Sequence, residues 1–479
     1  MEHFDVLIVG AGLSGIGAAY HLQERCPYKS YAILEGRDDL GGTWSLFRYP
    51  GVRSDSDMHT LGYSFKPWTG DNAVADGDAI LAYVRETAEE FGITSKIHFG
   101  TRVESASFST GEARWLVRTT REGEPVEYSC NFLFVCAGYY DYEQGYTPGF
   151  EGMDDFEGRI VHPQKWTDDI DYAGKRVIVI GSGATAMTLV PVLAKKAAHV
   201  TMLQRSPTYV FAWPRKDVVA NWLRARLEPM TAYRVTRFKN VMMGMAMYGL
   251  SRRFPKKARS FFVGRVQDAL GSDFDVKTNW SPRYDPWDER LCLVADGDLF
   301  DAMKAGSVDV VTEHIARFTK TGIELKSGQK LDADLVVTAT GLRLKFLGGM
   351  KLDVDGVVPD AASSMAYRGS MFSDVPNLAM SIGYINASWT LKCDLIAEYV
   401  CRLINHMDAH GYKTCTPRLD EPDMPREPLL DLRAGYVQRS MKDFPKGGTR
   451  VPWKLHQNYI RDILTMRQRP VDDGVMQFR

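Results

Sequence analysis

The sequence predicts an α/β protein with two parallel-sheet domains, the second of which carries a helical insertion. Two short apolar runs, at 5–9 and 176–180, each lead directly into a glycine-rich turn and a helical stretch. Continuous β-branched runs of this length are typical of strands buried on both faces of a parallel sheet. Between 218 and 269 the pattern changes to helices rich in Met, Phe and Arg. We therefore expect two dinucleotide-binding (Rossmann-like) folds, with a helical insertion in the second.

The first glycine-rich turn has the spacing G-x-G-x-x-G, and a helix is expected to follow it over 16–24. Such glycines allow a tight turn and a close approach of the backbone to a pyrophosphate, while the helix N-terminus supplies N–H donors. A second strand, at 30–34, ends in an acid about 20 residues after the last glycine, where a carboxylate accepts hydrogen bonds from a ribose. The residues expected to contact this dinucleotide are Gly10, Gly12, Ser14, Gly15 and Glu35.

A loop rich in glycine and polar residues follows at 41–55. Its paired glycines would let the backbone lie against a flat or phosphorylated ligand, and Trp44 offers a stacking face. Asp55, close behind Arg53, is a candidate partner for a catalytic cation. A solvated ion pair on a surface loop is the alternative, but the position after a dinucleotide fingerprint favours a cofactor contact. The residues expected to make it are Gly42, Thr43, Trp44, Ser45, Leu46, Arg53, Ser54 and Asp55.

A segment with two large rings, 156–166, lies between the two glycine-rich turns. It carries Phe156, Gly158, His162 and Trp166. One interpretation is an ordinary linker with buried aromatic residues. The other is a hinge that responds to binding of the second nucleotide.

The second glycine-rich turn has the spacing G-x-G-x-x-A and precedes a helix expected to run through 192. The next strand, 199–203, is followed by an arginine instead of an acid. A guanidinium suits a 2′-phosphate, and the serine after it can donate as well, so NADPH is expected here rather than NADH. A plain surface arginine is the alternative. The residues expected at this site are Gly181, Ser182, Gly183, Ala184, Thr185, Ala186, Arg205 and Ser206.

The helical stretch 218–269 contains many cations and almost no acids, and its apolar part at 241–248 is too short to span a bilayer. Two interpretations are open: a cap over the active site, or a peripheral patch attracted to anionic lipid. The cap is favoured, because the substrate site of an enzyme with two dinucleotide folds needs a roof that excludes water.

The rest of the chain completes these two domains. An amphipathic helix at 78–92 and β-structure at 97–135 belong to the first. A strand at 335–338 ends in the glycine turn that normally closes such a domain, and a helix at 390–407 returns to the first domain. The expected parts are 1–145, 146–340 with an insertion at about 215–285, and 341–479.

The net charge and the cysteine content limit which cellular compartment and which binding partners are expected. The formal net charge of −1 argues against a general affinity for nucleic acid or membranes. The seven cysteines contain no C-x-x-C pair, which argues against a disulfide framework and a zinc site, and no metal is expected. The first residues lack a signal-peptide pattern. A cytoplasmic protein is expected, with weak membrane association through the basic insertion left open.

Two longer patterns indicate a family. F-x-G-x-x-x-H-x-x-x-W is met at 156–166, and [AG]-G-x-W-x-x-x-x-[FY]-P-[GM]-x-x-x-D is met at 41–55. Together with Glu35 of the first nucleotide fold and Arg205 of the second, these patterns closely resemble those of the class B flavoprotein monooxygenases of the Baeyer–Villiger type. Stretches at 138–142, 204–209 and 383–390 resemble the subgroup that contains the mycobacterial ethionamide-activating monooxygenase.

The resemblance implies FAD as the bound cofactor and NADPH and O₂ as co-substrates. In such enzymes NADPH reduces the flavin, O₂ forms a C4a-peroxyflavin, and a ketone becomes an ester or lactone; sulfides or thioamides are oxidised too. Arg290 corresponds to the active-site arginine, Asp55 would position it, and Val103 would bring a backbone amide to the adenine. His162 and Trp166 would act through domain movement.

Two positions depart from the family pattern. Thr167 stands where Pro or Asp is usual, and Glu289 stands where many members have a lysine for the 2′-phosphate. The second departure leaves more of the phosphate contact to Arg205.

Three rival functions remain at this stage. A flavin-containing monooxygenase that oxygenates nitrogen or sulfur shares the fold, but is not expected to meet the 41–55 pattern. A disulfide reductase needs a redox cysteine pair near the flavin, which Cys26, Cys130 and Cys136 do not supply. A non-catalytic flavin-binding redox sensor is the alternative of a different class.

Overall fold

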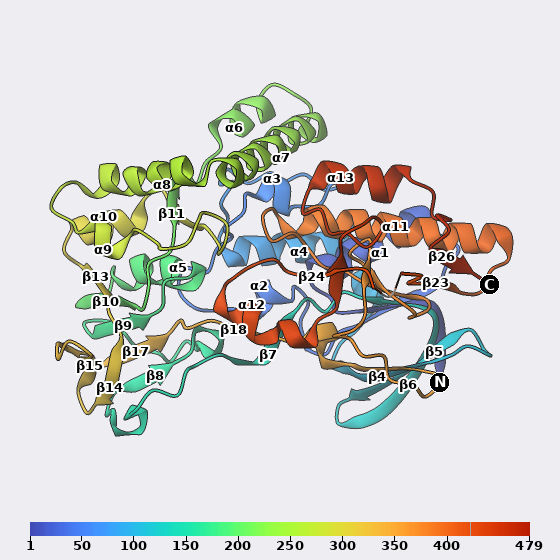
Figure 1. The fold of residues 1–479 in the computed structure, drawn as a ribbon, viewed down its shortest axis with the longest axis horizontal. Helices are drawn as coiled ribbons and strands as arrows, with labels where there is room; N and C mark the ends of the chain where they lie inside the picture. Colours follow the sequence, from blue (N-terminus) through green and yellow to red (C-terminus); the bar gives the residue numbers. More distant parts are fainter. Residues whose placement is uncertain (422) are drawn as a thin grey trace.

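The computed structural model describes residues 1–421 and 423–479 and contains two large sheets, which lie at opposite ends of the molecule (Figure 1). Helices from both halves and from the insertion cover them. Both chain termini lie at the end that holds the first sheet.

The first sheet has eight strands. They are β1 (Glu2–Val9), β2 (Tyr31–Leu34), β3 (Ile97–His98), β4 (Thr101–Ser109), β5 (Arg114–Arg121), β6 (Glu124–Val135), β19 (Lys351–Val354) and β22 (Leu378–Met380). Their order is β19-β4-β5-β6-β1-β2-β3, and β22 also pairs with β6. β1 is parallel to both β2 and β6, so the apolar run at 5–9 occupies the middle of the sheet and is buried towards its carboxyl end.

The second sheet has five strands. They are β8 (Arg159–Val161), β9 (Arg176–Ile180), β10 (His199–Gln204), β13 (Val308–Thr312) and β17 (Leu335–Thr338). All pairs in the order β13-β10-β9-β17-β8 are parallel. The run at 176–180 is β9, in the centre, where its aliphatic side chains are buried on both faces.

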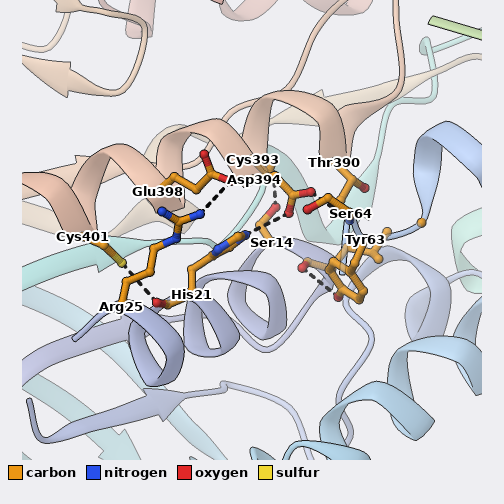
Figure 2. A network of polar contacts seen from close by, with 12 residues as sticks. Ser14, His21, Arg25, Tyr63, Ser64, Thr390, Cys393, Asp394, Glu398 and Cys401 are labelled. Atoms are coloured by element: carbon orange, nitrogen blue, oxygen red, sulfur yellow. Dashed lines mark hydrogen bonds and ion pairs between the residues drawn. The ribbon is translucent and has the colours of Figure 1, made fainter. Parts of the chain in front are cut away.

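The helix α11 (Trp389–His410) packs against α1 (Leu13–Arg25), which follows the first strand of the first sheet. Polar contacts cross this buried interface (Figure 2): His21 Nε2 lies 3.4 Å from Asp394 Oδ1, and Ser14 Oγ donates to Cys393 Sγ at 3.3 Å. Burial alone would raise the pKa of Asp394, but its contacts with His21 and with Arg237 of the insertion hold that pKa below the ordinary value.

The helical insertion consists of α6 (Val218–Arg224), α7 (Pro229–Arg253) and α8 (Pro255–Leu270), which form a layer along one side of the molecule (Figure 1). α7 is fixed to the first domain beside α3 (Met58–Leu61). Arg237 Nη1 donates to the carbonyl oxygens of His59, Thr60 and Gly62 at 2.9, 3.2 and 2.7 Å. None of the helices in the described ranges 1–421 and 423–479 is both long and apolar enough to cross a membrane.

The segment 156–166 is part of the second sheet and not a free linker, because it contains edge strand β8. Phe156 and Trp166 are buried in the core of that half. The chain crosses between the halves beside it, through β7 (Tyr140–Gly145) and β18 (Leu342–Leu344), which form an antiparallel pair. The segment therefore packs against the crossing and is not a plain linker between the halves.

The remaining elements are short or peripheral. Among the helices they are α2 (Thr43–Leu46), α4 (Gly77–Glu90), α5 (Ala184–Leu193), α9 (Val276–Asn279), α10 (Asp298–Lys304), α12 (Gly435–Ser440) and α13 (Tyr459–Ile463). Among the strands they are β11 (Val210–Trp213), β12 (Cys292–Ala295), β14 (Ile315–Thr319), β15 (Gly322–Leu325), β16 (Lys330–Asp332), β20 (Ala366–Tyr367), β21 (Met371–Phe372), β23 (Cys415–Pro417), β24 (Arg426–Pro428), β25 (Lys446–Gly448) and β26 (Met476–Phe478).

Candidate active site

A cavity of about 910 Å³ lies between the two halves of the molecule. Its wall combines the carboxyl ends of β1 and β2, the loop at 41–55, the start of α5, the middle of α7 and the residues before α11. Ligands of α/β sheets bind at the carboxyl ends of the strands, so the cavity has the place of a nucleotide site in both halves.

The first fingerprint forms a cradle that only glycine can make. Gly10 has φ +102°, and a Cβ there would lie 2.8 Å from the carbonyl oxygen of Cys136. A Cβ on Gly15 would lie 1.9 Å from the Gly10 oxygen. Gly10, Gly12 and Ser14 line the cavity, whereas Gly15 packs behind the turn. The backbone N–H groups at the start of α1 therefore face a space without intervening side chains.

Glu35 stands at the end of β2, where the sequence places a ribose acceptor. Its carboxylate accepts the N–H of Ala11 at 2.7 Å and the N–H of Arg37 at 3.0 Å. Burial raises the pKa of Glu35, and the two N–H donors oppose that rise. Val103 lies in the same part of the wall. These contacts fix one carboxylate beside the glycine cradle.

The loop at 41–55 closes over this cradle, because Gly12 and Gly42 touch backbone to backbone: a Cβ on Gly12 would lie 3.6 Å from the Gly42 Cα. Thr43 and Trp44 line the cavity. Ser45 and Leu46 lie outside it in the described structure, and the Ser45 hydroxyl donates to Asp39 at 2.7 Å.

The end of the same loop contributes two charged side chains to the cavity wall. Arg53 donates to Asp298 at 2.6 Å, so its guanidinium is paired with α10 and not with Asp55. The Ser54 hydroxyl donates to the carbonyl of Ser56 at 2.6 Å. Asp55 is left to face the other half of the cavity, where Arg290 stands.

Arg290 enters the cavity from the loop before β12. Its Nη1 lies 3.6 Å from Asp55 Oδ2, and its Nη2 donates to the Tyr139 hydroxyl at 3.3 Å. The Arg290 side chain is 31% exposed, which leaves part of the guanidinium open to the cavity. The hydroxyl of Tyr436, followed by Tyr139, Tyr140 and Asp55, keeps the pKa of Arg290 well above its ordinary value despite burial. The arrangement supplies a permanent, oriented positive charge.

Tyr436 is a functional candidate that the sequence does not reveal. It comes from α12, in the last 50 residues, where no motif marks it. Its hydroxyl faces the Arg290 guanidinium, and burial raises the pKa of Tyr436 to about 12, so the phenol remains neutral near neutral pH. Only the tertiary fold brings residue 436 to residue 290.

The second fingerprint repeats the glycine geometry. Gly181 has φ +140°, and a Cβ there would lie 2.3 Å from the Ala339 oxygen. Ser182 Oγ donates to the carbonyl of Ser206 at 3.0 Å, which ties the turn to the residues after β10. Ala184 and Thr185 line the cavity, and Ala186 is buried in the core. Gly181, Ser182 and Gly183 lie outside the cavity in the part of the chain described.

Arg205 and Ser206 are exposed at the carboxyl end of β10, the position that the sequence assigns to a 2′-phosphate. Glu289 lies near Arg205. Burial raises the pKa of Glu289, and the charge of Arg205 opposes that rise. The Glu289 carboxylate is thus close to the guanidinium that the sequence expects to bind phosphate.

α7 supplies an apolar wall of the cavity. Met243, Met245, Met247 and Tyr248 line it, opposite Phe211 of β11. Methionine side chains are flexible and polarisable, so such a wall adapts to apolar molecules of different shapes. The insertion is therefore a structural part of the site.

His162 lies at the crossing between the halves and not at the cavity. Its Nδ1 accepts the N–H of Gln164 at 3.2 Å, and its Nε2 therefore carries the proton that it donates to the Gly341 oxygen at 3.0 Å. Burial lowers the pKa of His162. A Cβ on Gly145 would lie 2.0 Å from the ring, so β7 passes directly over it. Gly158 is similarly confined, since a Cβ there would lie 2.7 Å from the Asp334 oxygen.

Comparison with known proteins agrees with this geometry. The family model "Flavin-binding monooxygenase-like" matches residues 4–350. The FAD-containing monooxygenase EthA of Mycobacterium tuberculosis (strain ATCC 25618 / H37Rv) is 51% identical over 100% of this chain and 98% of its own length. The probable FAD-binding monooxygenase AlmA of Acinetobacter baylyi (strain ATCC 33305 / BD413 / ADP1) is 46% identical over 100% of this chain and 96% of its own.

Solved structures share the fold. An oxidised steroid monooxygenase bound to NADP superposes with a TM-score of 0.73 at 25% identity, covering 86% of this chain and 88% of its own. The cyclohexanone monooxygenase of Rhodococcus sp. Phi1 bound to NADP⁺ superposes with a TM-score of 0.72 at 20% identity, covering 88% of this chain and 87% of its own. The expected fold of two dinucleotide-binding domains is confirmed. The chain belongs to the flavin-binding monooxygenase-like family.

Proposed function

We propose that this monooxygenase is of the Baeyer–Villiger type: it uses FAD, NADPH and O₂ to convert ketones to esters or lactones, and also oxidises sulfides or thioamides. One observation supports this most strongly, the pairing of Arg290 with Asp55 in a cavity onto which both dinucleotide folds open. The relatives named for FAD and the structures named for NADP support the choice of cofactors.

The residues around the first cradle suit FAD. Gly10 and Gly12 would admit the pyrophosphate, Glu35 would accept from the ribose, and Val103 lies where the adenine would end. When bound, FAD supplies the redox chemistry, taking hydride from NADPH and passing electrons to O₂. The protein contributes binding, orientation and charge.

Arg290 has the geometry for stabilising negative charge on oxygen. Its guanidinium is held by Asp55 and Tyr139 before any substrate enters, so no reorganisation is needed when charge develops. In a cavity with apolar walls, a fixed charge acts more strongly than it does in water. Arg290 would act directly on the reacting oxygen atoms, while Asp55 would hold Arg290 in place.

The apolar wall of α7 would exclude water and receive the hydrocarbon part of the substrate. Because Arg237 fixes α7 to the first domain, this wall would stay in place during turnover. A methionine-lined site predicts a broad range of lipophilic substrates and not one polar metabolite.

The deciding experiment offers the purified protein a ketone and a thioether with NADPH and ¹⁸O₂. We expect one labelled oxygen atom in an ester or lactone from the ketone, and in a sulfoxide from the thioether. A labelled sulfoxide without any ester would identify an N- or S-oxygenating monooxygenase instead. No label in either product would contradict oxygen transfer altogether.

We also propose that the insertion makes peripheral contact with an anionic membrane. The insertion exposes Trp222 (53%), Phe238 (68%) and Phe261 (53%), one on each of its three helices. The same segment exposes five cations: Arg226, Arg234, Arg253, Lys256 and Lys257. Apolar side chains beside cations are the combination that binds the surface of an anionic bilayer.

Sedimentation with lipid vesicles tests this contact. We expect binding to phosphatidylglycerol vesicles at low salt and a loss of binding in Phe238→Glu. Val358→Glu, at a position that is 72% exposed elsewhere on the molecule, is the matched control and should bind like wild type. Equal binding of both variants would show that the insertion is not the contact surface.

A further inference from the structure

Three arginines from distant parts of the sequence converge beside the second nucleotide fold. Arg205 follows β10, Arg343 lies on β18, and Arg439 lies on α12. The helix α12 packs against β18, which brings Arg439 towards Arg343. Burial lowers the pKa of Arg439, Tyr146 opposes this, and the charges of Arg343 and Arg205 lower the pKa further, so both arginines are close to it. Within residues 1–421 and 423–479, none of the three forms a salt bridge with an acid. Guanidinium groups that lie close together repel one another, and an anion that binds between them lowers this cost.

Arg439 is held in a defined orientation. Its guanidinium carbon lies 3.5 Å from the centroid of the Tyr146 ring, which follows β7. Its Nη2 lies 3.6 Å from where a Cβ on Gly341, which follows β17, would be. A guanidinium stacked on a ring keeps its N–H edge available, and that edge matches phosphate oxygens.

α12 connects this cluster to the catalytic cation. Tyr436 and Arg439 are three residues apart, so they lie on the same face of the helix. Tyr436 faces Arg290, and Glu289, the neighbour of Arg290 in the chain, lies near Arg205. This face of α12 therefore carries Tyr436 towards Arg290 and Arg439 towards Arg205.

The charge balance at β10 requires a second cation. Arg205 has the position expected for a 2′-phosphate ligand, but Glu289 places a carboxylate nearby. That carboxylate would repel a dianion. A guanidinium from another element would offset the charge of this carboxylate, and α12 carries Arg439 into its neighbourhood.

We propose that Arg439 binds the 2′-phosphate of NADPH together with Arg205, and that it offsets the negative charge of Glu289 beside this site. This inference rests on the proposed use of NADPH. The C-terminal helix α12 thereby becomes part of the site that distinguishes NADPH from NADH, with Arg343 adding positive potential from the crossing.

The test uses two nucleotides that differ only in the phosphate concerned: adenosine 2′,5′-bisphosphate and adenosine 5′-monophosphate. Their dissociation constants are measured by calorimetry on the FAD-loaded enzyme, so no turnover is required. We expect Arg439→Ala to weaken binding of the bisphosphate about tenfold, the loss of one charge-assisted contact, and to leave the monophosphate unchanged. Arg439→Lys should retain part of the preference.

Arg418→Ala is the matched control, because Arg418 pairs with Asp374 on the surface, at 2.8 Å, away from this cluster. Flavin content and melting temperature of each variant show whether it has folded. An equal loss for both nucleotides in Arg439→Ala, or no loss for either, would overturn the assignment of Arg439. If wild type itself shows no preference for the bisphosphate, the proposed use of NADPH fails instead, and the role of Arg439 fails with it.

Discussion

At the scale of single residues, the site depends on charges that are fixed before the ligands arrive. Arg290 is held by Asp55 and Tyr139, and Glu35 is held by two backbone N–H groups. Preorganised groups of this kind need not be oriented during the reaction, which is where most of their catalytic value comes from.

Glu35 gives a direct prediction on flavin binding. Glu35→Ala removes the acceptor for the ribose and leaves the Ala11 N–H without its partner. Hydrogen bonds to a charged group contribute about 1.5–3 kcal/mol, so we expect the FAD affinity to fall about tenfold to a hundredfold. Flavin fluorescence on titration of the apoprotein measures this. Glu89→Ala, on the exposed face of α4, should bind FAD as wild type does, and an unchanged constant in Glu35→Ala would remove Glu35 from the site.

Residue positions were predictable from the sequence where a local motif fixes them. The glycines of both turns, Glu35 and Arg205 stand at set distances from short strands, because a βαβ unit has nearly constant dimensions. Tyr436 and Arg439 were not predictable, since only the return of the C-terminal segment brings them to the site. The pairing of Arg53 with Asp298 was hidden for the same reason.

At the scale of elements, two contacts hold the parts of the active site in register. α7 is tied to the end of α3 by Arg237, and the crossing strands β7 and β18 pack over His162. The sequence predicted the helical insertion, and it marked the segment 156–166 by its F-x-G-x-x-x-H-x-x-x-W pattern. It did not show that β8 makes the segment an edge strand, because a run of three residues carries too little periodicity.

Arg237→Met tests the first contact. The methionine keeps the apolar stem but leaves three carbonyl oxygens and part of the Asp394 environment without their donor. Removing one partner of a buried charged network typically costs about 3 kcal/mol, which we expect in the free energy of unfolding from urea titration. Arg234→Met, on the exposed side of the same helix, should change it by less than about 0.5 kcal/mol. Similar values for both variants would mean that Arg237 does not anchor α7.

The pH dependence of stability tests the second contact, in which β7 and the Gly341 carbonyl enclose His162. Burial lowers the pKa of His162 below its ordinary value of 6.5, so the unfolded chain takes up the proton at a higher pH than the folded one. Stability must therefore fall as the pH drops through and below 6.5, where Nδ1 can no longer accept from Gln164. We expect the melting temperature to fall less between about pH 7.5 and about pH 5.5 in His162→Gln than in wild type. A parallel fall in both proteins would contradict this.

At the scale of the whole molecule, two nucleotide folds open onto one cavity, and the insertion and the C-terminal segment complete its walls. The two-domain fold was predictable because each half repeats the strand, glycine turn and helix in order. The way the halves close around the cavity was not, since it depends on long-range contacts such as those of Arg237 and Tyr436.

The most direct test of oxygen transfer under the charge of Arg290 is the fate of ¹⁸O₂ in Arg290→Ala, with Arg283→Ala in the same loop as the control. We expect the control and wild type to place labelled oxygen in the ester. Arg290→Ala should still oxidise NADPH but release labelled hydrogen peroxide, with the ester yield reduced at least about a hundredfold. A normal yield of labelled ester from Arg290→Ala would contradict the proposed role of this cation.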